Sequence, residues 1–336
     1  MSGDRDAPAA APAHVQVHAQ GPAGVTLARE GALALLAAAA AILVAWAVPW
    51  LKFVLTLALA KGIAVLGILL LLRAGQVSFG HAMFLATGAY TVAFVAPRIE
   101  EVLLLLPLAM LLATLLGLAV GLFVVRYRDI FFGMLNLALS MVLYSLLEKL
   151  YDYTKGTDGI RVAALRFAGT VPGRETQEWL MFGLALLLAI GFGLLVRAYL
   201  GSPMGRALAG IKTRETRLEF MGISARRVLL FAYVLSALMG GAAGALVAMT
   251  SRHVTPQLAY WTSSGELVFI AILGGAGSAL GPFLGAAGFE LVRVYAAAAV
   301  AEAWQLILGS VLLLVILFAP GGIWGMLSGR LRGRGA

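Results

Sequence analysis

The stretch VLLLLPLAMLLATLLGLAVGLFVV, residues 102–125, has no charged side chain along its whole length. A helix needs about 20 mostly apolar residues to cross the hydrocarbon core of a bilayer, and this stretch is long enough. Nine further apolar segments occur, at residues 32–50, 53–72, 79–97, 130–148, 179–197, 228–249, 265–275, 281–297 and 303–319. The sequence therefore predicts an all-α polytopic membrane protein with about ten transmembrane segments.

The composition argues against a water-soluble protein. Of the 336 residues, 61% are hydrophobic and 12% are charged, whereas soluble domains average about 25% charged residues. The formal net charge of +9 does not predict nucleic-acid binding, because there is no soluble basic domain to carry it. The sequence has no cysteine, which excludes disulfides and thiolate metal sites within it.

The distribution of lysine and arginine predicts the orientation in the membrane. If the N-terminus is cytoplasmic, 15 of the 25 basic residues fall inside, 8 fall outside, and Lys61 and Arg293 lie within spans. Cytoplasmic loops are enriched in Lys and Arg, so both termini are predicted to be cytoplasmic. The predicted organisation is a flexible tail over residues 1–30, rather than a cleaved signal, a transmembrane domain over 31–325 and a basic tail over 326–336.

The charged stretch SPMGRALAGIKTRETRLEFMGIS, residues 202–224, is the largest internal cytoplasmic loop in this orientation. Ser202 suits an N-cap and Pro203 suits the first helical position, so a short surface helix is predicted. Apolar residues interleave with its charges, which leaves two interpretations. The stretch is either a solvated loop that only sets the topology or a docking element for a cytoplasmic partner. The longest outer loop spans residues 150–178.

Glycines mark places where helix backbones are expected to come close together. The segment 265–275 is too short to span as a straight helix and runs into Gly274, Gly275, Gly277 and Gly281, so broken or close-packed backbone is expected there. Glycines four residues apart, as at Gly277, Gly281 and Gly285 or at Gly240 and Gly244, permit tight helix contact. A faint likeness between residues 75–90 and 274–288 is compatible with two inverted halves.

Lys61 stands near the middle of the second apolar segment. A lysine at that depth costs about 2.5–3.5 kcal/mol on insertion scales, which makes it a functional candidate. One hypothesis is that Lys61 faces a polar cavity or a solute carboxylate. The alternative is that it snorkels or pairs with a partner subunit. Glu290 and Arg293, three residues apart on one helix, are expected to pair with each other.

No enzyme motif is found. The sequence lacks G-x-x-x-x-G-K-[ST], G-x-S-x-G and H-E-x-x-H, and its four histidines do not cluster. The chain is therefore predicted not to be an enzyme and not to bind a nucleotide at a motif of its own. No metal site is predicted, because His81 has no clustered partners.

Four stretches, in order along the chain, resemble one family. They are AGQVSFGHAMFLATGAY at 74–90, GTDGI at 156–160, SPMGRALAGIKTRETRLEFMGIS at 202–224 and ELVFIAILGGAGSALGPFLGA at 266–286. All four are similar to motifs of the LivM-type permeases, which are subunits of branched-chain amino-acid ABC importers. The sequence departs from the family pattern at Ile68 and Arg73, and at Gly210, Thr213, Arg214 and Arg217, which make the 202–224 stretch more basic than usual.

The resemblance implies a type II ABC importer-like permease in the bacterial inner membrane, with no cofactor of its own. The implied partners are a LivH-like second permease, a periplasmic substrate-binding protein and two ATPase subunits that hold ATP and Mg. The matching residues of the 202–224 stretch would couple this chain to the ATPases: Ser202, Pro203, Gly205, Arg206, Ala207, Leu208, Ile211, Glu215, Glu219 and Gly222.

Two further groups of site residues are predicted. A translocation path is assigned to Lys61, Gln76, Ser78, Gly80, His81, Gly274, Gly275, Gly277 and Ser278, with helix packing as the alternative role of the motif residues. Thr157, Asp158 and Gly159 are the predicted dock for the binding protein, although tight-turn chemistry alone accounts for Asp158 and Gly159 about equally well.

The predicted function is import of branched-chain amino acids through this chain, delivered by the binding protein and driven by the partner ATPases. An ABC permease for urea, short amides or aromatic acids is the alternative within the class. A stand-alone secondary transporter that couples to protons through Lys61 and His81 is a rival of another class. A structural scaffold protein of the membrane is a third possibility.

Overall fold

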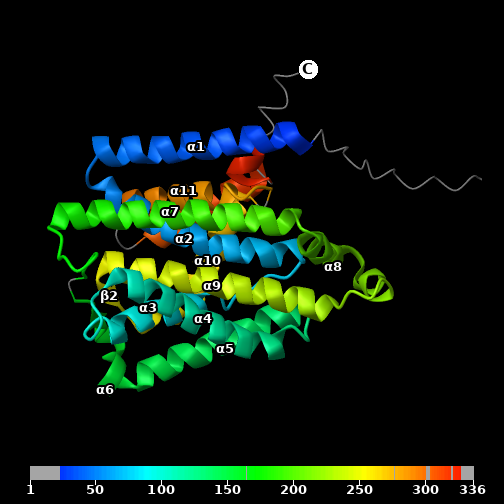
Figure 1. The fold of residues 1–336 in the computed structure, drawn as a ribbon, viewed down its shortest axis with the longest axis horizontal. Helices are drawn as coiled ribbons and strands as arrows, with labels where there is room; N and C mark the ends of the chain where they lie inside the picture. The colour runs from blue at the N-terminus through cyan, green and yellow to red at the C-terminus, as the bar shows by residue number, and fades with distance from the viewer. Residues whose placement is uncertain (1–22, 164, 276, 300–302, 319–320, 327–336) are drawn as a thin grey trace, which may run out of the picture. The chain divides into compact units, whose positions relative to one another are not determined.

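The computed structural model describes residues 23–163, 165–275, 277–299, 303–318 and 321–326 (Figure 1). Residues 1–22 and 327–336, which make up most of the two predicted tails, therefore lie outside the described residues. The chain divides into two units, residues 1–42 and residues 43–336. Helix α1 (Ala23–Ala47) begins within the segment that was predicted to be a flexible tail.

The prediction of an all-α membrane protein is confirmed, because each apolar segment of the sequence falls largely within a helix. After α1 the helices are α2 (Leu51–Arg73), α3 (Ala82–Val95), α4 (Val102–Val124), α5 (Asp129–Lys149), α6 (Tyr151–Thr154), α7 (Arg174–Gly201), α8 (Pro203–Phe220), α9 (Ala225–Ser251), α10 (Trp261–Gly274), α11 (Gly281–Ala299) and α12 (Trp304–Phe318). Two single-turn 3-10 helices, η1 (Gly156–Asp158) and η2 (Pro256–Ala259), lie between them. Strands β1 (Ile160–Arg161) and β2 (His253–Val254) pair antiparallel.

Five helices in the described part of the chain are long and apolar enough to cross a membrane: α2, α4, α5, α7 and α9. The helices formed by the third and eighth apolar segments, α3 and α10, have only 14 residues each. At 1.5 Å per residue such a helix extends about 21 Å, which is less than the hydrocarbon thickness of about 30 Å. Ten full spans and two inverted halves therefore stay predictions.

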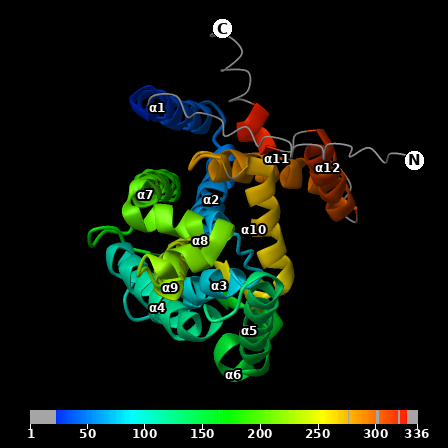
Figure 2. The same ribbon diagram turned by 90° about the vertical axis from the view of Figure 1, so that its right-hand side faces the viewer.

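Helices α2 and α9 form the centre of the larger unit. The most apolar windows of α2 and α9 are 78% and 72% buried, whereas those of α4, α5 and α7 are 33%, 28% and 33% buried. Helix α2 packs against α7, α9, α10 and α11, and α9 also packs against α3 and α4. In Figure 2, α7 is seen nearly end-on and α10 is seen side-on, so α10 crosses the direction of α7.

The larger unit has two ends that differ in structure (Figure 1). Helices α7 and α9 lead into and out of α8 at one end, called here the α8 end. The paired strands β1 and β2, together with α6, lie at the opposite end, called here the β end. A helix of 27 residues such as α9 separates the two ends by about 40 Å.

The backbones of α3 and α9 approach closely at glycines. A β-carbon placed on Gly88 would collide with the backbone of Gly241, and one placed on Gly244 would collide with the carbonyl oxygen of Leu85. Glycines 274, 281 and 285 hold α10 and α11 together in the same way, and Gly275 has a φ of +85°. The prediction of broken, close-packed backbone at Gly274–Gly277 is confirmed for the described residues there.

The third apolar segment becomes helical later than expected. Residues 79–97 were predicted as one helix, but α3 begins only at Ala82, and irregular backbone connects it to the end of α2 at Arg73. The His81 Nε2 atom lies 3.3 Å from the Ser236 Oγ atom of α9, and a β-carbon on Gly67 would lie 3.0 Å from the same nitrogen. The chain therefore turns back along α2 before α3 begins.

We predict that Gly88→Ala lowers the free energy of unfolding by about 1–3 kcal/mol, because the new methyl group overpacks the α3–α9 contact. Thermal unfolding of the purified chain in detergent measures the change. Gly183→Ala in α7 is the matched control, since a β-carbon there meets nothing within 4 Å and alanine favours a helix. An equal loss of stability in both variants would show that the close contact is not the cause.

Candidate functional site

Helix α8 begins with the cap that the sequence predicts. The Ser202 Oγ accepts a hydrogen bond from the Gly205 amide at 3.2 Å and donates one to the Tyr199 carbonyl oxygen at 2.6 Å. Pro203 occupies the first helical position. The helix is interrupted at Arg214, whose φ and ψ of −156° and 97° are not helical, so the stretch forms two short helical pieces rather than one.

One side of α8 is buried and the other is open. Its buried residues are Gly205, Ala207, Leu208, Ile211 and Leu218. Beyond them, Phe220 is 91% exposed and the following Met221 is 73% exposed. Two large apolar side chains at the end of a charged helix form a surface that a partner protein can cover. The arrangement thus combines firm attachment to the membrane helices with an apolar tip that remains open.

A bidentate ion pair joins α8 to the turn between α4 and α5. The Arg128 guanidinium donates to both carboxylate oxygens of Glu215, at 3.0 Å and 2.8 Å. The same guanidinium also donates to the carbonyl oxygens of Val125 and Tyr127. Two parallel hydrogen bonds fix the relative orientation of both groups as well as their distance. The second piece of α8 is therefore held to the α4–α5 turn.

Two contacts connect this end of the molecule to the irregular segment after α2. The Gln76 Oε1 accepts a hydrogen bond from the Asp129 amide at 2.7 Å, directly beside Arg128. Gly75, with a φ of +77°, lies against the Lys212 side chain of α8, where an added β-carbon would come within 3.1 Å of the Lys212 Cγ. The contacts of α8 therefore reach residue 75 directly and residue 76 through the α4–α5 turn.

The predicted path residues of this segment are buried among helices. Gln76, Ser78 and His81 are at most 3% exposed. His81 contacts Ser236, and Gly80 packs so closely on the backbone of Asn136 that a β-carbon would not fit. The Ser78 hydroxyl has no hydrogen-bond partner. In this conformation these residues hold α3, α5 and α9 together, while a role in the path stays a prediction.

Lys61 lies in a charge cluster within its own chain. Its Nζ atom is 2.5 Å from Glu290 Oε1 in α11 and 3.2 Å from Glu266 Oε2 in α10. Arg293 is 3.7 Å from Glu290, as predicted, but Lys61 is the closer partner. Two positive and two negative groups make this cluster formally neutral. The Lys61 charge is thus compensated without a solute, and its assignment to the translocation path stays untested.

The predicted glycine group of the path lies at the bend between α10 and α11. Gly274 and Gly275 end α10, Gly277 accepts a 3.5 Å hydrogen bond from Arg73, and the Ser278 Oγ accepts one from the Leu280 amide at 3.3 Å. The described structure therefore holds the predicted path residues in three groups: the Lys61 cluster, the segment around His81, and the bend between α10 and α11.

The predicted docking turn lies at the β end, across the molecule from α8. The Tyr151 hydroxyl donates a 2.7 Å hydrogen bond to the Asp158 carboxylate, and this bond raises the pKa of Tyr151. Gly159 has a φ of +71°, and a β-carbon there would lie 2.7 Å from the Val254 carbonyl oxygen and 2.8 Å from the His253 ring. The pairing of β1 with β2 therefore requires glycine at position 159. Contact of Thr157 with a binding protein stays a prediction.

Comparison with known proteins agrees with the motifs. The model of the family described as "Branched-chain amino acid transport system / permease component" matches residues 50–317, which is most of the chain. The chain belongs to this permease family. It is 28% identical over 275 residues to the "High-affinity branched-chain amino acid transport system permease protein LivM" of Escherichia coli (strain K12) and 27% identical to that of Salmonella typhimurium (strain LT2).

Each of these matches covers 74% of this permease-family chain and 64% of the relative. The chain therefore spans less than two thirds of the length of the curated relatives it matches. No solved structure matches it. The predicted resemblance to LivM-type permeases is confirmed. The family, together with five helices in the described residues that are long and apolar enough to cross a membrane, makes the protein a multi-pass membrane protein.

Sequence reasoning did not identify Arg128, the residue that attaches α8 of this permease to the α4–α5 turn. Its partner Glu215 lies 87 residues further along the chain. The only local signal was the short polar break Arg126–Asp129 between two apolar segments, which was used to count basic residues. Pairing across such a distance depends on the packing of α4, α5 and α9, which the sequence pattern does not specify.

We predict that Lys61→Met destabilises the permease by about 3–5 kcal/mol, because it leaves two carboxylates with Arg293 as the one remaining cation of the cluster. Adding Glu290→Gln restores the charge balance and is expected to recover part of the loss. Thermal unfolding in detergent measures both changes. Lys149→Met, at an exposed helix end, is the control and should change stability by about 0.5 kcal/mol or less.

Wild-type stability of Lys61→Met would mean that the ion pairs contribute nothing. Unchanged transport by a folded Lys61→Met variant would remove Lys61 from the translocation path.

Proposed function

We propose that this chain is a transmembrane permease subunit of an ATP-binding-cassette importer for branched-chain amino acids. The observation that carries the proposal is the construction of α8. A motif helix of the family is capped by Ser202, packed on the membrane helices along one side and open along the other. A helix that must pass on the movement of a partner needs both a surface to receive that partner and a firm attachment to the chain.

The proposed coupling runs through named contacts. Nucleotide-driven movement of the partner ATPases would displace the exposed side of α8, including Phe220 and Met221. The Arg128–Glu215 pair and the Lys212–Gly75 contact would carry the displacement to the segment before α3. Such a mechanism requires an element whose contacts differ between two states. The irregular backbone between α2 and α3 is suited to this, since no helical hydrogen-bond ladder restrains it.

The proposed partners follow from this assignment. They are a second, LivH-like permease, a periplasmic binding protein, and two ATPase subunits that bind ATP and Mg. The α8 end would face the cytoplasm and the β end the periplasm, with both termini cytoplasmic in the bacterial inner membrane. The excess of Lys and Arg on the α8 side of the predicted topology supports this orientation.

The solute class rests on the two relatives, whose names specify branched-chain amino acids. Urea, short amides and aromatic acids remain competing solutes in the same assay. The stand-alone proton-coupled transporter is disfavoured by the surroundings of Lys61, whose charge is already neutralised by Glu266 and Glu290.

The test is a pull-down of this chain in detergent with identification of every co-purifying protein. Labelled leucine uptake is then measured in vesicles rebuilt with and without those proteins, with ATP or with a proton gradient. Co-purification of a second permease and ATPases, with ATP-dependent uptake, is the expected result. Uptake by this chain alone that follows the proton gradient would contradict the proposal.

We predict that Glu215→Arg lowers leucine uptake about tenfold while ATP hydrolysis continues, because breaking a charge-assisted pair removes about 1.5–3 kcal/mol from the link. Arg128→Glu should have the same effect. The exchanged pair, Arg128→Glu with Glu215→Arg, is expected to recover much of the uptake.

The exchanged pair also separates two mechanisms. Failure of the exchange to restore uptake would show that Glu215 acts by direct contact with the ATPase rather than through Arg128. Wild-type uptake in both single variants would refute a coupling role for this pair.

A further inference from the structure

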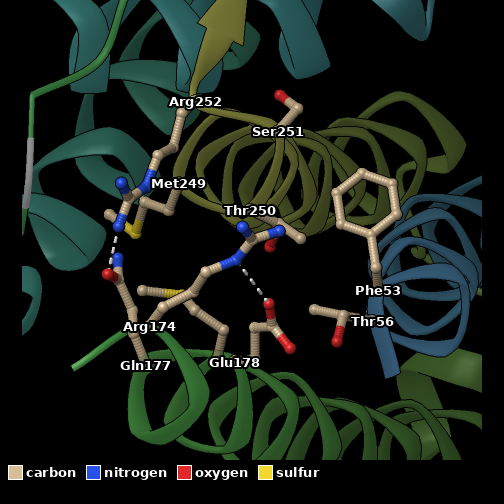
Figure 3. A pocket seen from close by; sticks show the side chains of 10 residues that line it. Phe53, Thr56, Arg174, Gln177, Glu178, Met249, Thr250, Ser251 and Arg252 are labelled. Carbon is tan, nitrogen blue, oxygen red and sulfur yellow. Dashed lines mark hydrogen bonds and ion pairs between the residues drawn. The ribbon is translucent and has the colours of Figure 1, made fainter. Parts of the chain in front are cut away.

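A cleft of about 320 Å³ opens at the β end, on the opposite side of the molecule from α8 (Figure 3). It lies between the first turns of α2, the first turns of α7 and the end of α9. Its volume is near the lower limit of ligand pockets in proteins, which suits a small solute. None of the residues that line it belongs to the motifs shared with the permease family.

The cleft has a mixed apolar and polar floor. Met181 and Met249 are at most 3% exposed and supply the apolar part, and Phe53 lines the cleft on the side opposite Met249. Thr250 also lines the cleft, and its hydroxyl oxygen is buried without a hydrogen-bond partner. A buried hydroxyl without a partner is uncommon in folded proteins and is satisfied when a ligand or water reaches it.

Arg252 provides a fixed positive charge at the rim. It caps the end of α9 in the left-handed conformation, with a φ of 53°, where helices usually place glycine. Its carbonyl oxygen accepts a hydrogen bond from the Val162 amide at 3.0 Å. Its guanidinium contacts the neutral Gln177 side chain and forms no ion pair with any described residue. An arginine thus stands at a position whose backbone conformation disfavours it.

Arg174 and Glu178 lie at the same rim, one turn apart on α7. Their side chains are 3.3 Å apart, and that of Arg174 is 93% exposed. An exposed pair of this kind contributes little stability, so Arg174 can be exchanged for a ligand group at small cost. Glu178 also lies 4.0 Å from the Nζ atom of Lys52, whose side chain is 3% exposed. Figure 3 shows the Arg252 side chain running along one edge of the cleft to Gln177, and the Arg174 side chain extending into its middle above Glu178.

We propose that this cleft is an outer binding site for a free α-amino acid with an apolar side chain. The carboxylate of the solute would bind Arg252 and Arg174, its ammonium group would bind Glu178, and its side chain would cover Met181 and Met249. This inference rests on the proposed import function and adds the place where the solute first contacts the permease. Two guanidiniums and one carboxylate above a methionine floor match the charges and the apolar part of such a zwitterion.

The experiment uses the chain with its co-purifying membrane and ATPase subunits in lipid nanodiscs, without any binding protein. Labelled leucine is competed with leucine, with leucinamide, which lacks the carboxylate, and with 4-methylpentanoate, which lacks the ammonium group. Wild type is expected to prefer leucine over both analogues by about tenfold or more, since each removes a charge-assisted hydrogen bond.

Two variants test which side chain binds the carboxylate of leucine and which binds its ammonium group. Arg252→Gln should lose the preference for leucine over leucinamide, and Glu178→Gln should lose the preference over 4-methylpentanoate. Arg252→Lys keeps the charge and should retain part of the preference, which separates loss of charge from misfolding at this strained position. Arg98→Gln, an exposed arginine in the α3–α4 connection that does not line the cleft, is the matched control and should bind like wild type.

Equal binding of all three compounds by wild type, or unchanged preferences in both cleft variants, would overturn the proposal. An Arg252→Gln variant that binds leucine normally but no longer captures the binding protein would also overturn it, because the cleft would then hold an acidic side chain of that protein. If wild type takes up leucine, the proposed import function stands even when the binding results overturn the cleft as a binding site. Absence of both uptake and binding in wild type would overturn the two together.

Discussion

The contact between the backbones of α3 and α9 is the constraint on which the remaining structure depends. Lipid offers no hydrophobic force that drives helices together, so their association rests on close packing of small residues. Gly88 and Gly244 allow that approach. It also brings α9 over the irregular backbone before α3, which can exist at membrane depth only when protein covers it.

Apolar length predicted most of the helices, because a run such as residues 102–125 has one stable form in lipid. Local chemistry predicted the Ser202 cap and the bend at Gly275 equally well. The late start of α3 was not predictable in this way. Residues 79–81 continue an apolar stretch, and their departure from a helix is stabilised by Ser236 and Asn136, which follow more than 50 residues later.

The candidate sites differ in the same way, because some have a local sequence signal and others depend on residues far apart in the chain. The α8 residues were predictable because a single continuous motif contains them. Arg128 and Glu215 meet across 87 residues, and Gln177 and Arg252 meet across 75, so neither pair has a local pattern. Lys61 was identified as unusual from its depth alone, but its neutral surroundings depend on two later helices. Sequence patterns thus predict which charged side chains are costly to place in the membrane, whereas the fold determines which groups neutralise their charge.

The Lys61 cluster also imposes an order on biosynthesis. Glu266 lies 205 residues after Lys61, and ribosomes add about 5–20 residues per second. Helix α2 therefore exists for about 10–40 s before the first of its two carboxylate partners has been made. During that interval the lysine must be held in the translocon, the headgroup region or another protein, because bare lipid tolerates it poorly. Final insertion of α2 is thereby tied to the synthesis of α10 and α11.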